Sequence, residues 1–214
     1  MVKIQGKSLK ILLIVIGIVV IGLTVATIFF LKKGQVDTEE IVFDPNSIVT
    51  ESLEEPDETK PKEYEVPADI PKRISIPQLD IDGLIQLVSI DQYGRIAVPS
   101  NIYIAGWYVN SVRPGEKGLS IVSGHRNGKT NPGVFYNLEK LKKDDLVTIE
   151  YGDDSIREFL VIDVIQIVTE NAQEVMYERL EGVDKQLVLV TCGGEYDKEM
   201  KTYIDRVIVR ARGI

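Results

Sequence analysis

Hydrophobic and polar positions divide the chain into three regions of different texture. Residues 11–31 form one uninterrupted apolar run of 21 residues without a charge, ILLIVIGIVVIGLTVATIFFL. Residues 34–70 mix acids with four prolines and show no sustained period. From Pro71 onward, short β-branched runs are broken by Gly, Pro, Asn and Asp about every 8–12 residues, as in all-β domains. The pattern predicts a membrane helix, an extended linker and a mostly β domain, in that order.

The apolar run is long enough to cross a bilayer. At about 1.5 Å per residue, a helix over 11–31 spans the ~30 Å hydrocarbon layer. A cleaved signal peptide is the alternative, but its apolar region is usually only about 7–15 residues long. We therefore expect residues 1–10 to form a short cytoplasmic tail, residues 11–31 a single transmembrane helix, and the rest of the chain to lie outside the cell.

The linker, residues 32–70, is strongly acidic. Between residues 34 and 70 there are twelve Asp and Glu but only two Lys. High net charge and scattered proline favour an extended or disordered spacer. The alternative is a short autoinhibitory segment that folds over the following domain.

Residues 71–214 are predicted to form one mostly β domain, a barrel or sandwich with one or two short helices. In the run QLVLVT both alternating faces are apolar, so this strand is expected to be covered on both sides. Helices are predicted over 134–141 and 172–177. The predicted strands cover residues 73–76, 83–90, 119–123, 145–151, 157–168, 186–191 and 203–211.

Composition removes several classes of function. The formal net charge is −8, and basic residues are concentrated only in the first 33 residues, so a nucleic-acid binder is not expected. The single cysteine excludes an internal disulfide, and the single histidine excludes a His-rich metal site. We expect neither a metal nor another cofactor.

The single cysteine and the single histidine each follow a predicted strand. Cys192 precedes Gly193 and Gly194, whose uncovered amides are candidate oxyanion donors. His125 lies in the polar stretch SGHRNGK, and a nearby imidazole is able to activate a thiol and to protonate a leaving amine. The alternatives are a buried structural cysteine, a plain Gly-Gly turn and a solvated histidine.

Arg206 interrupts an otherwise Val/Ile strand, YIDRVIVRA. If this strand lies beside that of Cys192, its guanidinium is placed to stabilise an oxyanion or to bind a substrate carbonyl. The alternative is an ordinary ion pair with Asp205 or Glu199. Three amides, Asn110, Asn127 and Asn131, are candidates for orienting His125.

Several pieces of the sequence occur together, in the same order, in a known family. With RISIPQLDIDGLI, AGWY, RPGEKGLSIVSGHRN, LVTC and RVIVRA, the chain resembles the sortases, membrane-anchored cysteine transpeptidases of Gram-positive cell surfaces, over residues 71–214. The resemblance implies an eight-stranded β-barrel with Cys192 as nucleophile, His125 as acid/base partner and Arg206 as transition-state stabiliser. It also implies that Thr191 lies beside the substrate, and the uncovered amides of Gly193 and Gly194 make these two residues further candidates for substrate binding.

The stretch CGGEYD, followed by YIDRVIVRA, is most similar to class F or class E sortases. Two positions depart from common patterns. Val188 stands where the TLxTC motif has its first Thr, and Ile204 stands where class F chains often carry the arginine. Arg210, on the same strand face as Arg206, is therefore the alternative functional arginine.

The resemblance also implies a reaction and a set of partners. Sortases cleave LPxTG-like C-terminal sorting signals through a thioacyl intermediate and transfer the surface protein or pilin to an amine of a cell-wall precursor or a lysine, and hydrolysis can compete. Two alternatives come from other classes. One is a different wall-directed cysteine enzyme, an L,D-transpeptidase or a peptidase, and the other is an inert surface-binding module.

Overall fold

The computed structural model describes residues 46–53 and 55–214, which belong to one compact unit, Asp44–Ile214. The predicted cytoplasmic tail, the predicted membrane helix over 11–31 and the first part of the linker lie outside the described residues. Within the described part of the chain, every helix is too short or too polar to cross a bilayer.

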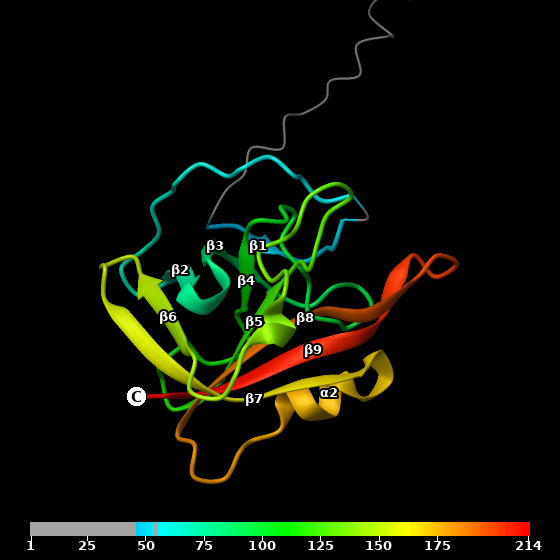
Figure 1. The fold of residues 1–214 in the computed structure, drawn as a ribbon. Coiled ribbons are helices and arrows are strands. Elements are labelled where there is room, and N and C mark those ends of the chain that lie inside the picture. The colour runs from blue at the N-terminus through cyan, green and yellow to red at the C-terminus, as the bar shows by residue number, and fades with distance from the viewer. Residues whose placement is uncertain (1–45, 54) are drawn as a thin grey trace, which may run out of the picture. The chain divides into compact units, whose positions relative to one another are not determined.

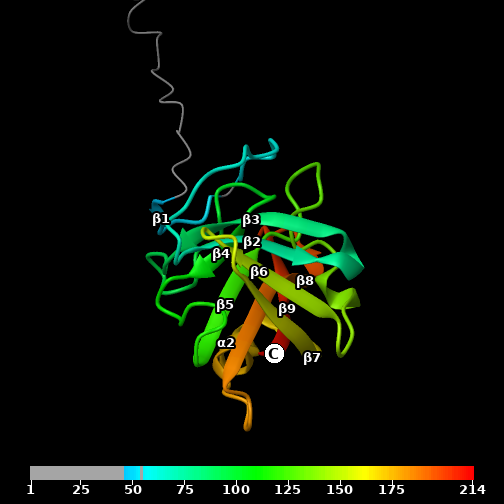
Figure 2. The same cartoon turned by 90° about the vertical axis from the view of Figure 1, so that its left-hand side faces the viewer.

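The domain is a closed barrel of eight strands with one helix (Figures 1 and 2). The strands follow the spatial order β3-β2-β6-β7-β9-β8-β5-β4, and a parallel pairing of β3 with β4 closes the circle. A ninth, two-residue strand, β1 (Ile48–Val49), adds to β3 from outside. The barrel strands are β2 (Pro71–Ile76), β3 (Ile81–Val88), β4 (Ala105–Tyr108), β5 (Gly118–Gly124), β6 (Leu146–Tyr151), β7 (Ile156–Val168), β8 (Lys185–Asp197) and β9 (Thr202–Gly213).

Alternation along the strands builds the core inside the barrel. In β6, Val147, Ile149 and Tyr151 are buried, whereas the residues between them are half-buried. Because successive side chains of a strand point to opposite faces, these three face the interior. Each large apolar side chain buried in this way contributes roughly 1.5–3 kcal/mol.

Strand β8 is covered on both faces, as its sequence predicts. Leu187 and Leu189 belong to the interior core, while Val188 belongs to a second cluster outside the barrel. That outer cluster includes Ile208 of β9 and Ala172 of the helix α2 (Thr169–Tyr177). In Figure 1, α2 lies along the outside of β7 and β9. The helix thus covers one part of the outer β8–β9 surface and leaves another part open.

Seven predicted strands are confirmed, with shifts at their ends, and two features differ. The predicted helix over 134–141 is wrong, because Asn137 adopts a left-handed conformation (φ 67°) and leaves only the 3-10 turn Leu138–Lys140. Strand β4 was not predicted, because four residues containing a glycine and two aromatics carry no clear strand period. The predicted helix over 172–177 is confirmed, but it begins at Thr169.

Candidate active site

Cys192 lies inside strand β8 and not at its end as predicted. The strand continues to Asp197, because a register shift between Gly193 and Tyr196 places two residues opposite one of β9. Such a β-bulge lets a strand absorb an extra residue and twist more strongly without ending. Gly194 occupies the bulge with φ 73°, a conformation that glycine adopts without steric cost. The Gly-Gly pair is therefore a bulge in a continuing hairpin rather than a terminal turn.

Cys192 and Arg206 are direct partners across β8 and β9. Strand alternation puts both on the outer face of the barrel, since Val188 and Val190 of β8 and Ile208 of β9 pack in the outer cluster. Cys192 is partly exposed to solvent. It is therefore accessible to a substrate approaching from outside the barrel.

The guanidinium of Arg206 is held by backbone oxygens. Its Nη1 donates to the carbonyls of Tyr203 at 3.0 Å and Asp205 at 2.8 Å. Within the described residues, no carboxylate lies within ion-pair distance of it. The ion pair with Asp205 or Glu199 that the sequence left open is therefore not formed, because the Asp205 carboxylate accepts a hydrogen bond from Gln166 instead. The positive charge of Arg206 is not neutralised locally.

Arg210, the alternative arginine, is fully engaged elsewhere. It pairs with Asp163 at 2.5 Å and with Glu178 at 2.6 Å, and it lies opposite Val188 rather than opposite Cys192. These two carboxylates raise the pKa of Arg210, with Asp163 as the main cause. The structure thus places Arg206, and not Arg210, next to the thiol.

His125 immediately follows the last residue of β5. Strands β5 and β8 are parallel, with Ser123 beside Val190, so continuing the register brings His125 beside Cys192. Thr191 reinforces this alignment, because its buried hydroxyl donates to the Gly124 carbonyl at 2.8 Å. The side chain of Thr191 therefore holds β8 against the end of β5.

The imidazole of His125 is oriented by a backbone carbonyl. Its Nε2 lies 2.7 Å from the oxygen of Pro99, and a carbonyl only accepts hydrogen bonds, so Nε2 carries a proton. Nδ1 is then the nitrogen of the neutral ring that carries no proton. Burial lowers the pKa of His125, and the hydrogen bond with Pro99 offsets only part of that effect.

The three candidate amides do not orient the ring. Asn110 donates to the Tyr108 hydroxyl, Asn127 accepts from Tyr203, and Asn131 donates to Glu58. Sequence reasoning missed the Pro99 carbonyl. A backbone acceptor has no residue signature, so no signal in the sequence was available to find it.

The loop after His125 is bound to the β8–β9 hairpin. The Tyr203 hydroxyl donates to Asn127 Oδ1 at 2.7 Å, and the Arg126 guanidinium lies 5.9 Å from the Tyr203 ring centre. Arg126 also forms a two-pronged ion pair with Glu139, at 3.0 and 3.1 Å. These contacts fix the histidine-bearing loop relative to the strands of Cys192 and Arg206.

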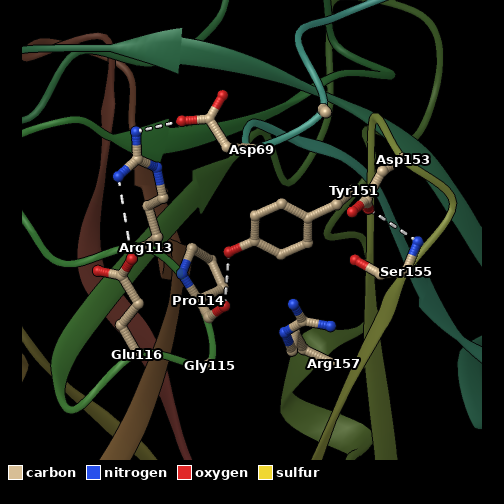
Figure 3. A pocket seen from close by; sticks show the side chains of 10 residues that line it. Asp69, Arg113, Pro114, Gly115, Glu116, Tyr151, Asp153, Ser155 and Arg157 are labelled. Atoms are coloured by element: carbon tan, nitrogen blue, oxygen red, sulfur yellow. Dashed lines mark hydrogen bonds and ion pairs between the residues drawn. The ribbon is translucent and has the colours of Figure 1, made fainter.

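A cavity of about 360 Å³ lies at the other end of β5 (Figure 3). It is lined by residues 113–116, which precede β5, whereas His125 follows that strand. Arg113 pairs there with Asp69 at 2.7 Å, and the Tyr151 hydroxyl donates to the Pro114 carbonyl at 2.6 Å. Burial raises the pKa of Tyr151 to about 12, so its hydroxyl stays neutral. The cavity contains neither the thiol nor the imidazole and is separate from the candidate active site.

A family model for the sortase domain matches residues 74–214. The chain therefore belongs to the sortase family, the group of cysteine transpeptidases that its motifs resemble. This membership disfavours a wall-directed cysteine enzyme of another family. No curated protein gives a significant match.

Solved structures of sortases are similar to this chain at low sequence identity. Sortase C1 from Streptococcus agalactiae is 21% identical with a TM-score of 0.51, covering 67% of this chain and 66% of that one. Sortase A from Corynebacterium diphtheriae is 21% identical with a TM-score of 0.49, over 68% of this chain and 60% of that one. A Clostridium perfringens sortase D5 transpeptidase is 24% identical with a TM-score of 0.49, over 71% and 83%. The class F or class E assignment stays a prediction.

Proposed function

We propose that this chain is a cysteine transpeptidase that cleaves LPxTG-like sorting signals. The observation that carries the proposal is the direct pairing of Cys192 with Arg206, next to His125 at the end of β5. A thiol, an imidazole and an unneutralised guanidinium on one outer face are the groups that acyl transfer from an amide requires.

In the proposed reaction, Nδ1 of His125 takes the proton of the Cys192 thiol, and the resulting thiolate attacks the carbonyl carbon of the scissile amide. The electron pair of the C=O bond moves to the oxygen, and the Arg206 guanidinium together with amides of Gly193 and Gly194 stabilises this oxyanion. The oxyanion then re-forms the C=O bond, and the C–N bond breaks as the protonated His125 gives the proton that came from the thiol to the leaving amine. The products are a thioacyl enzyme and the free C-terminal fragment.

Transfer to an acceptor amine reverses these roles. The amine attacks the thioester carbonyl, His125 takes the amine proton, and the carbon–sulfur bond breaks to release the thiolate. We propose surface proteins or pilins as donors and a cell-wall precursor or lysine amine as acceptor, with water competing as acceptor. No step requires a metal or another cofactor.

The test uses the full chain, a library of sorting-signal peptides and mass spectrometry with and without added amines. We expect cleavage of LPxTG-like peptides and amine-dependent products, both lost in Cys192→Ala. Lys117→Ala is the matched control, because this exposed lysine lies at the far end of β5 and pairs only with Asp184. Turnover retained by Cys192→Ala contradicts the proposal.

We also propose that residues 11–31 anchor the chain in the membrane with the barrel outside the cell. A membrane-held enzyme meets membrane-held substrates at high effective concentration. Because Cys192 is the single cysteine, an impermeant thiol reagent reports the side on which the barrel lies. We expect labelling in intact cells, and labelling only after lysis contradicts this orientation.

A further inference from the structure

Two separate segments hold the candidate catalytic histidine. Pro99 supplies the carbonyl that accepts from Nε2. Residues 126–133 form the loop that follows His125 in the chain. A hydrogen bond of 2.9 Å from the Phe135 amide to the His125 carbonyl joins the two ends of this loop. Displacing either segment therefore moves or rotates the imidazole. Both segments are contacted by one short stretch of the linker, residues 55–59.

Glu58 binds the loop on one side. Its carboxylate accepts from the Thr130 hydroxyl at 2.5 Å, the Asn131 side-chain amide at 2.7 Å, the Thr130 backbone amide at 3.1 Å and the Lys129 backbone amide. These hydrogen bonds, led by those of Thr130 and Asn131, lower the pKa of Glu58 to about 2. A side chain on Gly128 would collide with this carboxylate. The loop is thus shaped around an ionised Glu58 at any physiological pH.

Asp57 binds the Pro99 side. Its amide donates to the Ser100 carbonyl at 2.7 Å, and its own carbonyl accepts from the Ile102 amide at 3.0 Å. Its carboxylate also accepts from the Asn101 side chain at 3.1 Å. These contacts fix the backbone one residue beyond Pro99.

Two consecutive linker residues therefore connect the two supports of one ring. Asp57 fixes the segment that carries the acceptor for Nε2, and Glu58 fixes the loop into which His125 leads. The start of the loop, at Arg126 and Asn127, contacts the β8–β9 hairpin. Its tip, residues 129–131, is bound by this stretch of the linker. Neither carboxylate contacts the thiol, so any effect on the chemistry has to act through the histidine.

We propose that residues 55–59 form a clip that sets the position and tautomer of His125, with Asp57 and Glu58 as positioning residues. The inference rests on the proposed function for its kinetic consequence, but its structural consequence is independent of any substrate. The linker is then a working part of the enzyme as well as a spacer. An autoinhibitory segment, the alternative that the sequence left open, has the opposite consequence for activity.

The experiment compares the full chain with Glu58→Ala and with Thr130→Val, which breaks the same contact from the loop side. Because the chain has one histidine, the ¹⁵N signals of its ring belong to His125 without assignment. We expect the parent to show the tautomer protonated at Nε2 and both variants to show a mixture of tautomers. We also expect kcat for the sorting peptide to fall about tenfold, with KM within about twofold of the parent, as misplacement of a reacting group predicts.

Glu63→Gln is the matched control, since Glu63 is a linker carboxylate that pairs with Arg73 on β2 and contacts neither support. It is expected to match the parent in both measurements, and circular dichroism confirms folding of each variant. An unchanged tautomer in the folded variants overturns the proposal. Faster turnover overturns it as well, because it would mean that residues 55–59 inhibit the enzyme by covering its site. If the parent cleaves no peptide, the proposed function fails while the ring signals still decide the role of the clip.

Discussion

The β8–β9 hairpin consists of two halves that use the same strands for different purposes. The half nearer the chain's C-terminus is called the covered half: Arg210 lies there opposite Val188 and pairs with two carboxylates. The other half is called the open half: Arg206 lies there opposite Cys192, and its guanidinium is bound only by carbonyl oxygens. The two arginines share one strand and one face, four residues apart. They differ in whether carboxylates neutralise the guanidinium, in whether the strand pairing around them is regular, and in how far other side chains cover them.

The difference shows how one hairpin separates stability from chemistry. A guanidinium bound by two carboxylates has its charge neutralised and its geometry fixed, and it contributes mainly to holding neighbouring elements together. A guanidinium held by carbonyls keeps its charge for an incoming oxyanion. The bulge at Gly194 interrupts the regular ladder just beyond Cys192, within the open half, and the pairing resumes at Tyr196. We infer that the packing and ion pairs of the covered half stabilise the hairpin and so keep Cys192 and Arg206 of the open half in place.

The largest expected effect comes from removing each arginine in turn. Arg206→Ala is expected to reduce kcat/KM about 10²–10³-fold, as loss of an oxyanion donor does, with little change in Tm. Arg210→Ala is expected to reduce stability by about 1–3 kcal/mol, because Asp163 loses its buried partner, with a much smaller effect on turnover. Peptide cleavage and thermal unfolding measure the two responses. Loss of turnover in Arg210→Ala together with loss of stability in Arg206→Ala would contradict these roles and make Arg210 the functional arginine.

The sequence predicted the regular parts of this hairpin better than its open part. Alternating apolar residues in QLVLVT were enough to predict a strand covered on both faces, because the period of a strand is a local property. The continuation of β8 to Asp197 was missed, because a Gly-Gly pair has the same sequence in a turn and in a bulge. The choice between Arg206 and Arg210 stayed open, since it depends on Asp163 of β7, which is distant in the chain.

The surroundings of His125 were the least predictable part of the site. The motif around it was visible, but its acceptor is a backbone carbonyl, and the clip comes from a linker whose composition is typical of a spacer. The closed barrel of eight strands was implied by the family resemblance and is confirmed. Periodicity alone did not detect β4, the strand that closes it.

A smaller effect is expected from Gly194→Ala, which changes the bulge in the open half. An added Cβ would lie 2.5 Å from the Asp205 carboxylate, in addition to occupying a left-handed conformation. Gly182→Ala is the matched control, because Gly182 has φ 75° and nothing within 4 Å of an added Cβ. We expect the control to lose about 1–2 kcal/mol from the backbone alone and Gly194→Ala to lose more. Equal losses, measured by urea unfolding, would show that the bulge tolerates a side chain.

The smallest expected effect uses pH to distinguish His125, which follows β5 and lies beside the open half of the hairpin, from Arg210 in the covered half. Burial lowers the pKa of His125 in the folded chain, so between its ordinary value of about 6.5 and its folded value the unfolded chain binds more protons. Stability is then full above that window and falls as pH decreases through it. In the covered half, the two carboxylate partners raise the pKa of Arg210 further above its already high value, so this guanidinium stays charged throughout the window and adds no slope there.

The control for this prediction is His125→Gln, which keeps a side-chain amide to donate to Pro99 but does not titrate. Urea unfolding of both proteins at several pH values between 5 and 7.5 gives the difference in free energy of unfolding. We expect this difference to change with pH in favour of the parent toward higher pH, at no more than about 1.4 kcal/mol per pH unit for one proton. A constant difference would mean that the folded pKa of His125 is not lowered. The imidazole would then be free to charge at pH 6, and its burial beside Pro99 would not keep it neutral.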